Sequence, residues 1–277
     1  ITEWVPLTEL AVPAGQGYLA VTFRLGDPVW TRIRACFVKA VRFVGAGVGS
    51  ADFCTCGGVK DLQQAEVCLY DVLMDDQLLS FLPPGAERVF VGKRCGDHTV
   101  KQPEITSLIA QYARRGLRVV RLKGGDPGLF GRLAEETDEL DRLALPYRVR
   151  AGVSALTVAT TGTGLLLTRR GVSRGFTALT PRAEGGAVAG VALEVRSRLP
   201  LVLFMSVKVA GDMARQLLAE GWEGTAPAAI VFNAGADDES IFRSTLGALR
   251  DGAADAFETE APGLLVIGSA AAGAYRR

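Results

Sequence analysis

Short apolar runs recur along the chain from residue 41 onward, and each has the four or five residues of a short buried strand. We expect strands at 41–44, 67–70, 88–92, 118–122 and 147–150. Helices are expected between them at 61–65, 103–115 and 134–143. Strands that alternate with helices predict an α/β domain whose sheet is mostly parallel.

A second series of elements follows a glycine- and threonine-rich stretch at 152–164. Strands are expected at 175–180, 200–205, 228–233 and 263–268, with a helix at 209–220 and an Ala/Gly-rich loop at 183–192. The first residues differ from the rest, because they are rich in proline and glycine and offer one candidate strand, at 17–23. The pattern predicts an N-terminal extension (1–38), an N-terminal α/β domain (39–153) and a C-terminal α/β domain (154–277).

Composition narrows the possible partners. With 48% hydrophobic residues the 277-residue chain can bury a substantial core, and its net charge of +1 creates no field that favours nucleic acid or an anionic membrane. No apolar run approaches the roughly 20 residues of a membrane span, and no secretory leader is apparent. Five cysteines without a framework spacing, and one histidine, predict free thiols in the cytoplasm and no metal site.

A glycine-rich turn, Val44-Gly-Ala-Gly-Val-Gly-Ser50, directly follows the first expected strand. Glycines at a strand end let the backbone turn sharply or approach a ligand closely. The spacing is not that of the dinucleotide fingerprint. A ligand-binding loop and a tight structural turn therefore both remain open for this segment.

The stretch Arg121-Leu-Lys-Gly-Gly-Asp-Pro-Gly-Leu-Phe-Gly-Arg132 carries the strongest chemical signal. It places two glycines and a carboxylate at the carboxyl end of an expected strand, where open α/β sheets bind ligands. Arg132 and Glu135 follow at i, i+3 spacing and can share a helix face. An ordinary exposed ion pair is the alternative for these two residues.

A pair of adjacent arginines, Arg169 and Arg170, lies in the connection Leu167-Thr-Arg-Arg-Gly171. Guanidinium groups bind carboxylates and phosphates in bidentate fashion, so the pair suits a ligand with several carboxylates. A solvated charge pair is the alternative.

These segments occur together with others in a distinctive order: VGAG (44–47), LYD (69–71), LPPGAE (82–87), VGKR (91–94), GGDP (124–127) and LTRRG (167–171). The chain resembles the tetrapyrrole methylases, most densely from residue 42 to residue 171. The resemblance implies two α/β domains with mostly parallel or mixed sheets, S-adenosyl-L-methionine in the cleft between them, and a homodimer. It also implies two successive C-methylations of uroporphyrinogen III to precorrin-2, in sirohaem or cobalamin biosynthesis, with S-adenosyl-L-homocysteine as by-product.

The resemblance also implies roles for individual residues. Asp71, Arg132, Glu135 and Arg170 match catalytic positions, with Asp71 and Glu135 as alternative proton acceptors. The implied substrate-binding residues are Lys93, Arg94, Arg132, Arg169 and Arg170. The implied cofactor-binding residues are Gly47, Val48, Gly124, Gly125, Asp126, Leu129, Phe130, Ser154, Phe204 and Met205.

The chain departs from the family pattern at several of these positions. Val48 and Ser50 replace a proline and an aspartate, Gly128 replaces a bulky apolar residue, and Arg169 replaces a histidine. Two alternatives to uroporphyrinogen III methylation therefore remain. One is a methylase acting on a different tetrapyrrole or other small molecule, and the other is a catalytically silent homologue with a binding role.

Overall fold

The computed structural model describes residues 27–29, 38–92, 101–181, 198–255, 257 and 261–273. Contacts divide the chain into two units, Ile1–Gly47 with Ala51–Val153, and Val48–Ser50 with Ser154–Arg277. Most of the predicted extension at 1–38, with its strand at 17–23, and the predicted loop at 183–192 lie outside the described residues, so these predictions stay open.

The first unit is built on a sheet of five parallel strands in the order β3-β2-β4-β1-β5. The strands are β1 (Val41–Gly45), β2 (Val67–Tyr70), β3 (Glu87–Phe90), β4 (Val119–Lys123) and β5 (Tyr147–Arg150). All five predicted strands are confirmed to within two residues at each end. The parallel arrangement is also confirmed, since each strand is connected to its successor by a crossover that contains helix.

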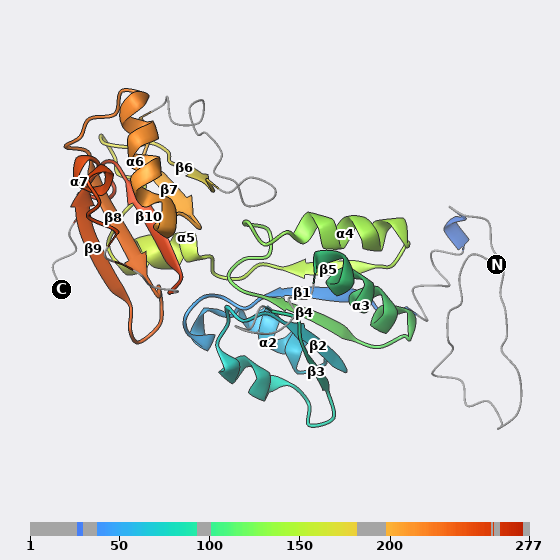
Figure 1. Ribbon diagram of the computed structural model, residues 1–277. Helices are drawn as coiled ribbons and strands as arrows, with labels where there is room; N and C mark the ends of the chain where they lie inside the picture. Colours follow the sequence, from blue (N-terminus) through green and yellow to red (C-terminus); the bar gives the residue numbers. More distant parts are fainter. Residues whose placement is uncertain are drawn as a thin grey trace, which may run out of the picture. The chain divides into compact units, whose positions relative to one another are not determined.

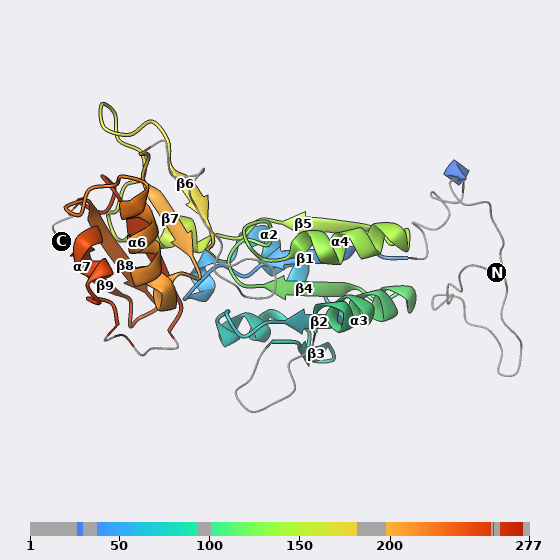
Figure 2. The same cartoon turned by 45° about the horizontal axis from the view of Figure 1, so that its top comes forward.

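Helices cover both faces of this sheet, as Figures 1 and 2 show. On one face, α3 (Gln102–Arg114) and α4 (Leu133–Arg142) pack against side chains such as Phe43 and Leu69. On the other face, the 3₁₀ segment η2 (Asp76–Phe81) and α2 (Cys56–Leu62) pack against Val44 and Leu122. A further 3₁₀ turn, η1 (Ala51–Phe53), precedes α2.

The predictions for α3 and α4 are confirmed to within one residue at each end, whereas the predicted helix at 61–65 is wrong in its bounds. Helix α2 begins after Thr55, whose hydroxyl accepts a hydrogen bond from the amide of Gly58 (3.1 Å), and it ends at Leu62. Its first turn contains two glycines, which are poor helix formers, so the N-cap and tertiary packing determine where it starts.

The second unit contains a mixed sheet in the order β6-β7-β10-β8-β9. Strands β6 and β7 are parallel and the other three pairs are antiparallel. The strands are β6 (Thr177–Leu179), β7 (Leu201–Phe204), β8 (Pro227–Phe232), β9 (Ser240–Thr245) and β10 (Gly263–Ile267). The four predicted strands are confirmed. Strand β9 was not predicted, since this sheet-edge strand is half exposed and carries little apolar signal.

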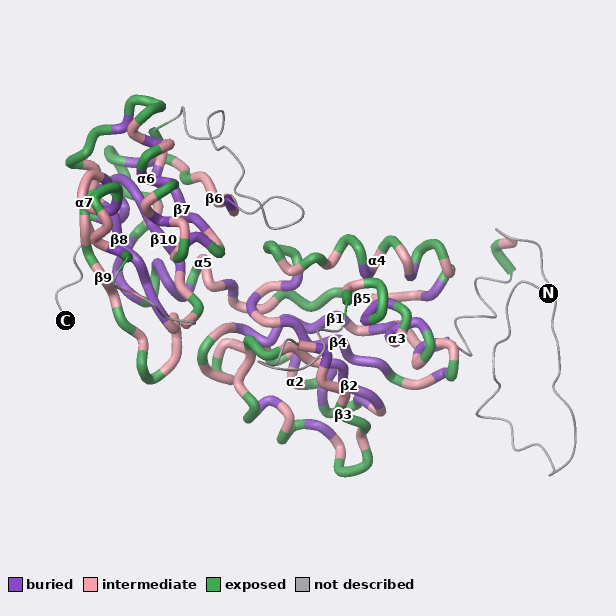
Figure 3. The backbone as a smooth tube through the Cα atoms, in the orientation of Figure 1, coloured by how far each residue is buried: buried purple, intermediate pink, exposed green. Residues whose placement is uncertain are grey.

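The helical segments of the second unit are α5 (Ala155–Thr157), the π-turn η3 (Val158–Gly162), η5 (Val207–Val209), α6 (Ala210–Ala219) and α7 (Leu246–Arg250). The predicted helix at 209–220 is confirmed as α6, and α7 was not predicted. Separate apolar clusters cover the two faces of the sheet, and Figure 3 shows the buried strands at the centre of each unit. Among the described residues, no helix combines the length and apolarity needed to span a bilayer.

Candidate active site

The carboxyl ends of all five strands of the first unit lie at one edge of the sheet, because the strands are parallel. The glycine-rich turn follows β1 at this edge, Asp71 follows β2, and Gly124–Asp126 follow β4. Gly152 comes two residues after the end of β5. Topology therefore gathers the predicted residues of the first unit at the edge where α/β sheets bind ligands.

Glycines allow three strand ends at this edge to touch through their backbones. A Cβ added to Gly45 would lie 2.4 Å from the nitrogen of Gly152, and one added to Gly152 would lie 2.2 Å from the oxygen of Gly125. Gly47 and Gly125 adopt positive φ angles (75° and 67°) and exchange two backbone hydrogen bonds of 3.2 and 2.7 Å. This packing explains the glycines without a ligand, so the cofactor roles of Gly47 and Gly125 stay predictions.

Gly124 and Asp126 hold the loops at this edge in place. A Cβ on Gly124 would lie 2.4 Å from the carbonyl oxygen of Leu73, so the loop after β2 packs directly on it. One carboxylate oxygen of Asp126 accepts a hydrogen bond from the Gly128 amide (2.8 Å) and the other accepts one from the Gly152 amide (3.3 Å). Gly128, which replaces a bulky apolar residue of the family pattern, therefore lies in a tight Asx turn.

A cluster of charged side chains lies directly behind this edge. Its central residues, Arg121 and Glu136, were not predicted as site residues. Arg121, 2% exposed on β4, donates from Nη2 to Asp71 (2.8 and 3.0 Å) and from Nε to Glu136 (3.2 Å). Lys123 donates to the other oxygen of Glu136 (2.9 Å). Burial, and then the charge of Arg121, hold the pKa of Lys123 below its ordinary value, although Glu136 opposes this shift. We call Asp71, Arg121, Lys123 and Glu136 the ion cluster.

A periodicity in the sequence could have revealed the cluster. Arg121 and Lys123 alternate along β4 with the buried residues Val120 and Leu122, so they share a face with Val119. Leu133, Glu136 and Leu140 occupy positions i, i+3 and i+7 of α4. Glu136 therefore lies within the apolar stripe of this helix. Charged residues at core positions indicate a paired, buried set.

Arg132 and Glu135 form an ion pair on the outer surface of α4. The guanidinium donates twice to the carboxylate, at 2.7 Å each, and both side chains are more than half exposed. The hydrogen bond from Arg132 holds the pKa of Glu135 below its ordinary value. This geometry is that of an ordinary exposed ion pair, the alternative considered for these two residues. A lowered pKa also makes Glu135 a weak proton acceptor.

We expect the Arg132→Ala substitution to raise the pKa of Glu135 towards that of a free glutamate. The side-chain carboxyl resonances of Glu135 and Glu139, followed by NMR as the pH is varied, measure this directly. Glu139, whose pKa is lowered by Arg142 on the same helix, is the internal control and should not change. An unaltered Glu135 titration would mean that Arg132 does not set its acidity.

Three predicted site residues are held in left-handed backbone conformations. Phe130, Arg132 and Met205 have φ angles of 56°, 55° and 54°. Side chains other than glycine rarely adopt this region, and such strain concentrates at functional sites. Leu129, Phe130 and Met205 are also exposed to solvent. Three described residues outside the predicted site share this backbone conformation, so it is the combination with exposed apolar side chains that marks the 129–132 loop and the end of β7.

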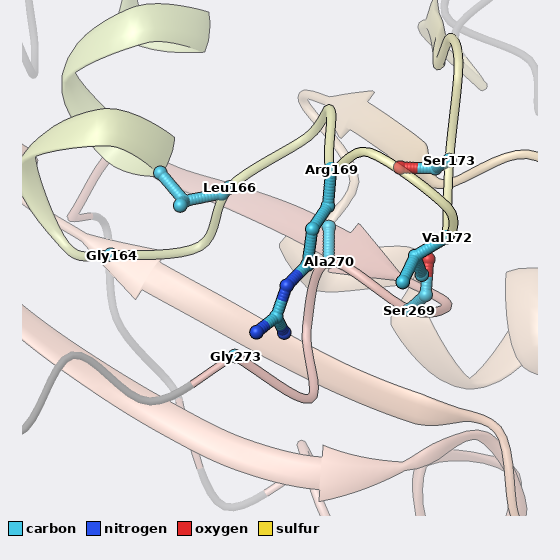
Figure 4. A pocket seen from close by; sticks show the side chains of 8 residues that line it. All are labelled: Gly164, Leu166, Arg169, Val172, Ser173, Ser269, Ala270 and Gly273. Carbon is cyan, nitrogen blue, oxygen red and sulfur yellow. The ribbon is translucent and has the colours of Figure 1, made fainter.

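In the second unit, Arg169 and Arg170 belong to a tight turn with Gly171 at φ 80°. The amide of Val172 donates to the carbonyl of Arg169 (2.9 Å). Arg169 lines a hollow of about 230 Å³ together with Gly164, Leu166, Val172, Ser173, Ser269, Ala270 and Gly273, and Figure 4 shows its guanidinium directed into this hollow. Arg170 is exposed and does not line it, so the two arginines do not act there as one clamp.

The remaining predicted residues are placed as follows. Ser154 caps α5 by accepting a hydrogen bond from the amide of Leu156 (3.1 Å), and Phe204 ends β7. Val48 is half buried in the segment grouped with the second unit. Lys93 and Arg94 lie outside the described residues. Within the described part of the chain, no three histidine, cysteine or acidic side chains gather as metal ligands would.

Comparison with known proteins connects this geometry to a family. The model of the tetrapyrrole (corrin/porphyrin) methylases matches residues 40–250. The chain belongs to this family. Siroheme synthase 1 of Yersinia enterocolitica is 39% identical to this tetrapyrrole methylase over 230 residues, which cover 82% of the chain and 48% of the relative. The chain therefore spans about half the length of the curated relatives that it matches.

Among the solved structures that share its fold are two methyltransferases. The uroporphyrin-III C-methyltransferase of Thermus thermophilus, complexed with S-adenosyl homocysteine, has a TM-score of 0.73 and 34% identity, covering 83% of this chain and 98% of that one. A cobalt precorrin-4 methyltransferase of cobalamin biosynthesis has a TM-score of 0.73 and 26% identity, covering 84% and 95%. The predicted family and α/β fold of this tetrapyrrole methylase are thus confirmed.

Proposed function

We propose that the chain transfers methyl groups from S-adenosyl-L-methionine to two carbon atoms of uroporphyrinogen III, giving precorrin-2. The observation that carries the proposal is the 34% identity over 98% of the Thermus uroporphyrin-III C-methyltransferase, whose structure holds S-adenosyl homocysteine. The siroheme synthase relatives support a place in sirohaem or cobalamin biosynthesis. S-adenosyl-L-homocysteine is then the second product.

The edge of the first sheet has features that fit such a cofactor. The exposed apolar side chains of Leu129 and Phe130, in the loop that follows Gly124–Asp126, suit the flat face of an adenine. In the second unit, Met205 offers a further exposed apolar side chain. When bound, S-adenosyl-L-methionine supplies a methyl group activated by a positively charged sulfur.

Asp71 is the better of the two candidate proton acceptors. Methylation of the macrocycle forms a C–C bond while the C–S bond breaks, and a proton must then leave the substrate. Asp71 lies at the carboxyl edge with its carboxylate held by Arg121, and its side chain remains 28% exposed. Both oxygens of each carboxylate are bound by an arginine, so the two candidates differ in position: Glu135 lies on the exposed surface of α4, whereas Asp71 directly follows the end of β2. Arg132 and Arg170 are proposed to bind substrate carboxylates.

The Asp71→Asn substitution is expected to lower the rate of methyl transfer by about 10²- to 10⁴-fold, the usual contribution of a positioned base. Affinity for S-adenosyl-L-homocysteine, measured by calorimetry, should stay close to that of the wild type. Asp76→Asn is the matched control, because Asp76 is an exposed aspartate on the following 3₁₀ segment. A fully active Asp71→Asn enzyme would remove Asp71 from the proton step.

The function itself is tested with purified protein, S-adenosyl-L-methionine and enzymatically made uroporphyrinogen III. A gain of two methyl groups, measured by mass spectrometry, supports the proposal, and no gain with this substrate rejects it. A second candidate is methylation of a later corrin precursor, because the precorrin-4 methyltransferase matches with the same TM-score of 0.73. A panel of tetrapyrroles in the same assay distinguishes the two.

We also propose that the chain works in the cytoplasm as a homodimer, as the family resemblance implies. The exposed apolar side chains of Leu166, Val172 and Phe176 in the second unit are candidates for a covered surface. The three described cysteines, Cys54, Cys56 and Cys68, are free thiols, which suits a reducing compartment. Light scattering coupled to size-exclusion chromatography measures the oligomeric state.

A further inference from the structure

Glu136 is a completely buried carboxylate that binds three donors from two elements. One oxygen accepts hydrogen bonds from Arg121 Nε (3.2 Å) and from the side-chain amide of Gln102 (2.9 Å), and the other accepts one from Lys123 (2.9 Å). Its exposed fraction is 0%. A buried charge is tolerated only when it is paired and hydrogen-bonded in this way.

The guanidinium of Arg121 is fixed on every side by this arrangement. Besides Glu136, it donates from Nη1 to the carbonyl of Leu122 (2.9 Å) and from Nη2 to both carboxylate oxygens of Asp71. Glu136 is thus the buried carboxylate among the three partners that set where the Nη2 end of the guanidinium points. Among the four charged residues of the ion cluster, Asp71 is the one whose side chain reaches solvent appreciably.

We propose that Glu136 is a positioning residue, which orients Asp71 at the reactive edge by holding Arg121 in place. Glu136 on α4 contacts Arg121 on β4, and Arg121 in turn contacts Asp71 at the end of β2. Gln102 on α3 orients Glu136 in turn. This inference rests on the proposed function, because it assigns the purpose of the orientation to the proton step at Asp71.

The neighbouring carboxylates on α4 give matched controls. Glu139 also pairs with an arginine of the same helix, Arg142 at 2.6 Å, but this pair lies at the surface and touches no part of the ion cluster. The substitutions Glu136→Gln and Glu139→Gln remove the same charge from the same helix. A difference between them therefore reports the contacts of Glu136 and not the composition of α4.

The experiment compares methyl transfer by the wild type, Glu136→Gln and Glu139→Gln. We expect kcat of Glu136→Gln to fall on the order of 10²-fold, the effect of a misplaced reacting group, while KM and affinity for S-adenosyl-L-homocysteine change less than about threefold. Glu139→Gln should retain the wild-type kcat. A Glu136→Gln enzyme with wild-type kcat would overturn the inference.

A double variant distinguishes positioning from a purely structural role. Lys123→Met/Glu136→Gln restores the charge balance that Glu136→Gln disturbs, and it should recover folding stability. It should not recover kcat, because Arg121 still lacks the carboxylate that holds its Nε. Recovery of both stability and kcat would mean that Glu136 acts on stability alone.

A crystal structure of Glu136→Gln tests the inference without any assay. We expect Arg121 to turn and its contact with Asp71 to lengthen or break. An unchanged Arg121–Asp71 pair would overturn the positioning role, even if the wild type proved inactive on uroporphyrinogen III. An inactive wild type would refute the proposed function, whereas an unchanged Arg121–Asp71 pair in the Glu136→Gln structure would refute the inference.

Discussion

Replacing Gly152 by alanine is expected to lower the free energy of unfolding of the first unit by about 3 kcal/mol or more, at the upper end of overpacking effects. The new Cβ would lie 2.2 Å from the carbonyl oxygen of Gly125 and 2.7 Å from the backbone of Gly45. Both neighbours are backbone at the ends of central strands, so no side chain can rotate away. The ends of β1, β4 and β5 would have to separate.

Gly85→Ala is the control for this prediction. Gly85 belongs to the same unit, and an added Cβ would meet no atom within 4 Å. Chemical denaturation followed by circular dichroism, together with hydrogen exchange of the backbone amides of β1, β4 and β5, measures both variants. Equal stability of the two would show that the strand ends are not in close contact. If Gly152→Ala still folds, we expect it to lose affinity for S-adenosyl-L-homocysteine, since the displaced backbone forms the proposed site.

The strands were predictable because each is a short apolar run between polar or glycine-rich segments. Every residue of β1, β2 and β4 except Arg42 and Tyr70 is buried, and most of these residues are apolar, so the core signal is strong there. Strand β9 and helix α7 were missed for the opposite reason. Helix α7 has only five residues, and β9 is half exposed and paired on one side only, so both depend on tertiary contacts that periodicity does not encode.

The sequence indicates where the candidate site lies, but not which of its side chains contact one another. Parallel strands predict that Asp71 and the Gly124–Asp126 turn share an edge, and the structure places them there. Glu135 and Glu136, adjacent in the chain, have opposite surroundings, which were not predicted. One lies in solvent beside Arg132, and the other is buried against Arg121 and Lys123. The apolar stripe of α4 already indicates that Glu136 faces inward, but its partners Arg121 and Lys123 follow only from the packing of α4 on β4.

The glycines show a similar limit. The Gly124-Gly125 pair at a strand end predicts that a ligand approaches the backbone there. In the structure the space beside Gly124 is taken by Leu73, and Gly125 contacts the backbones of Gly45, Gly47 and Gly152. A glycine pattern indicates that other atoms closely approach the backbone. Whether those atoms belong to a ligand or to the chain itself depends on tertiary structure.

The Arg121→Met substitution is expected to destabilise the protein by about 3–5 kcal/mol, because it leaves one buried carboxylate without its guanidinium partner. Glu136 would keep Lys123 and Gln102 but lose the Nε hydrogen bond, and Asp71 would lose both of its contacts with Nη2. Arg142→Met is the control, since Arg142 is an exposed arginine of the α4 surface pair. It should leave the unfolding transition unchanged.

A triple variant separates stability from positioning. Arg121→Met, Lys123→Met and Glu136→Leu together replace the buried members of the ion cluster by apolar side chains of similar size, and such replacements are often neutral or stabilising. We therefore expect the triple variant to regain most of the stability that Arg121→Met loses. Its methyl transfer should stay as low as that of Asp71→Asn, because nothing then orients Asp71. A triple variant as unstable as Arg121→Met would show that the cluster itself stabilises the fold, and a triple variant with wild-type activity would show that Asp71 needs no partner.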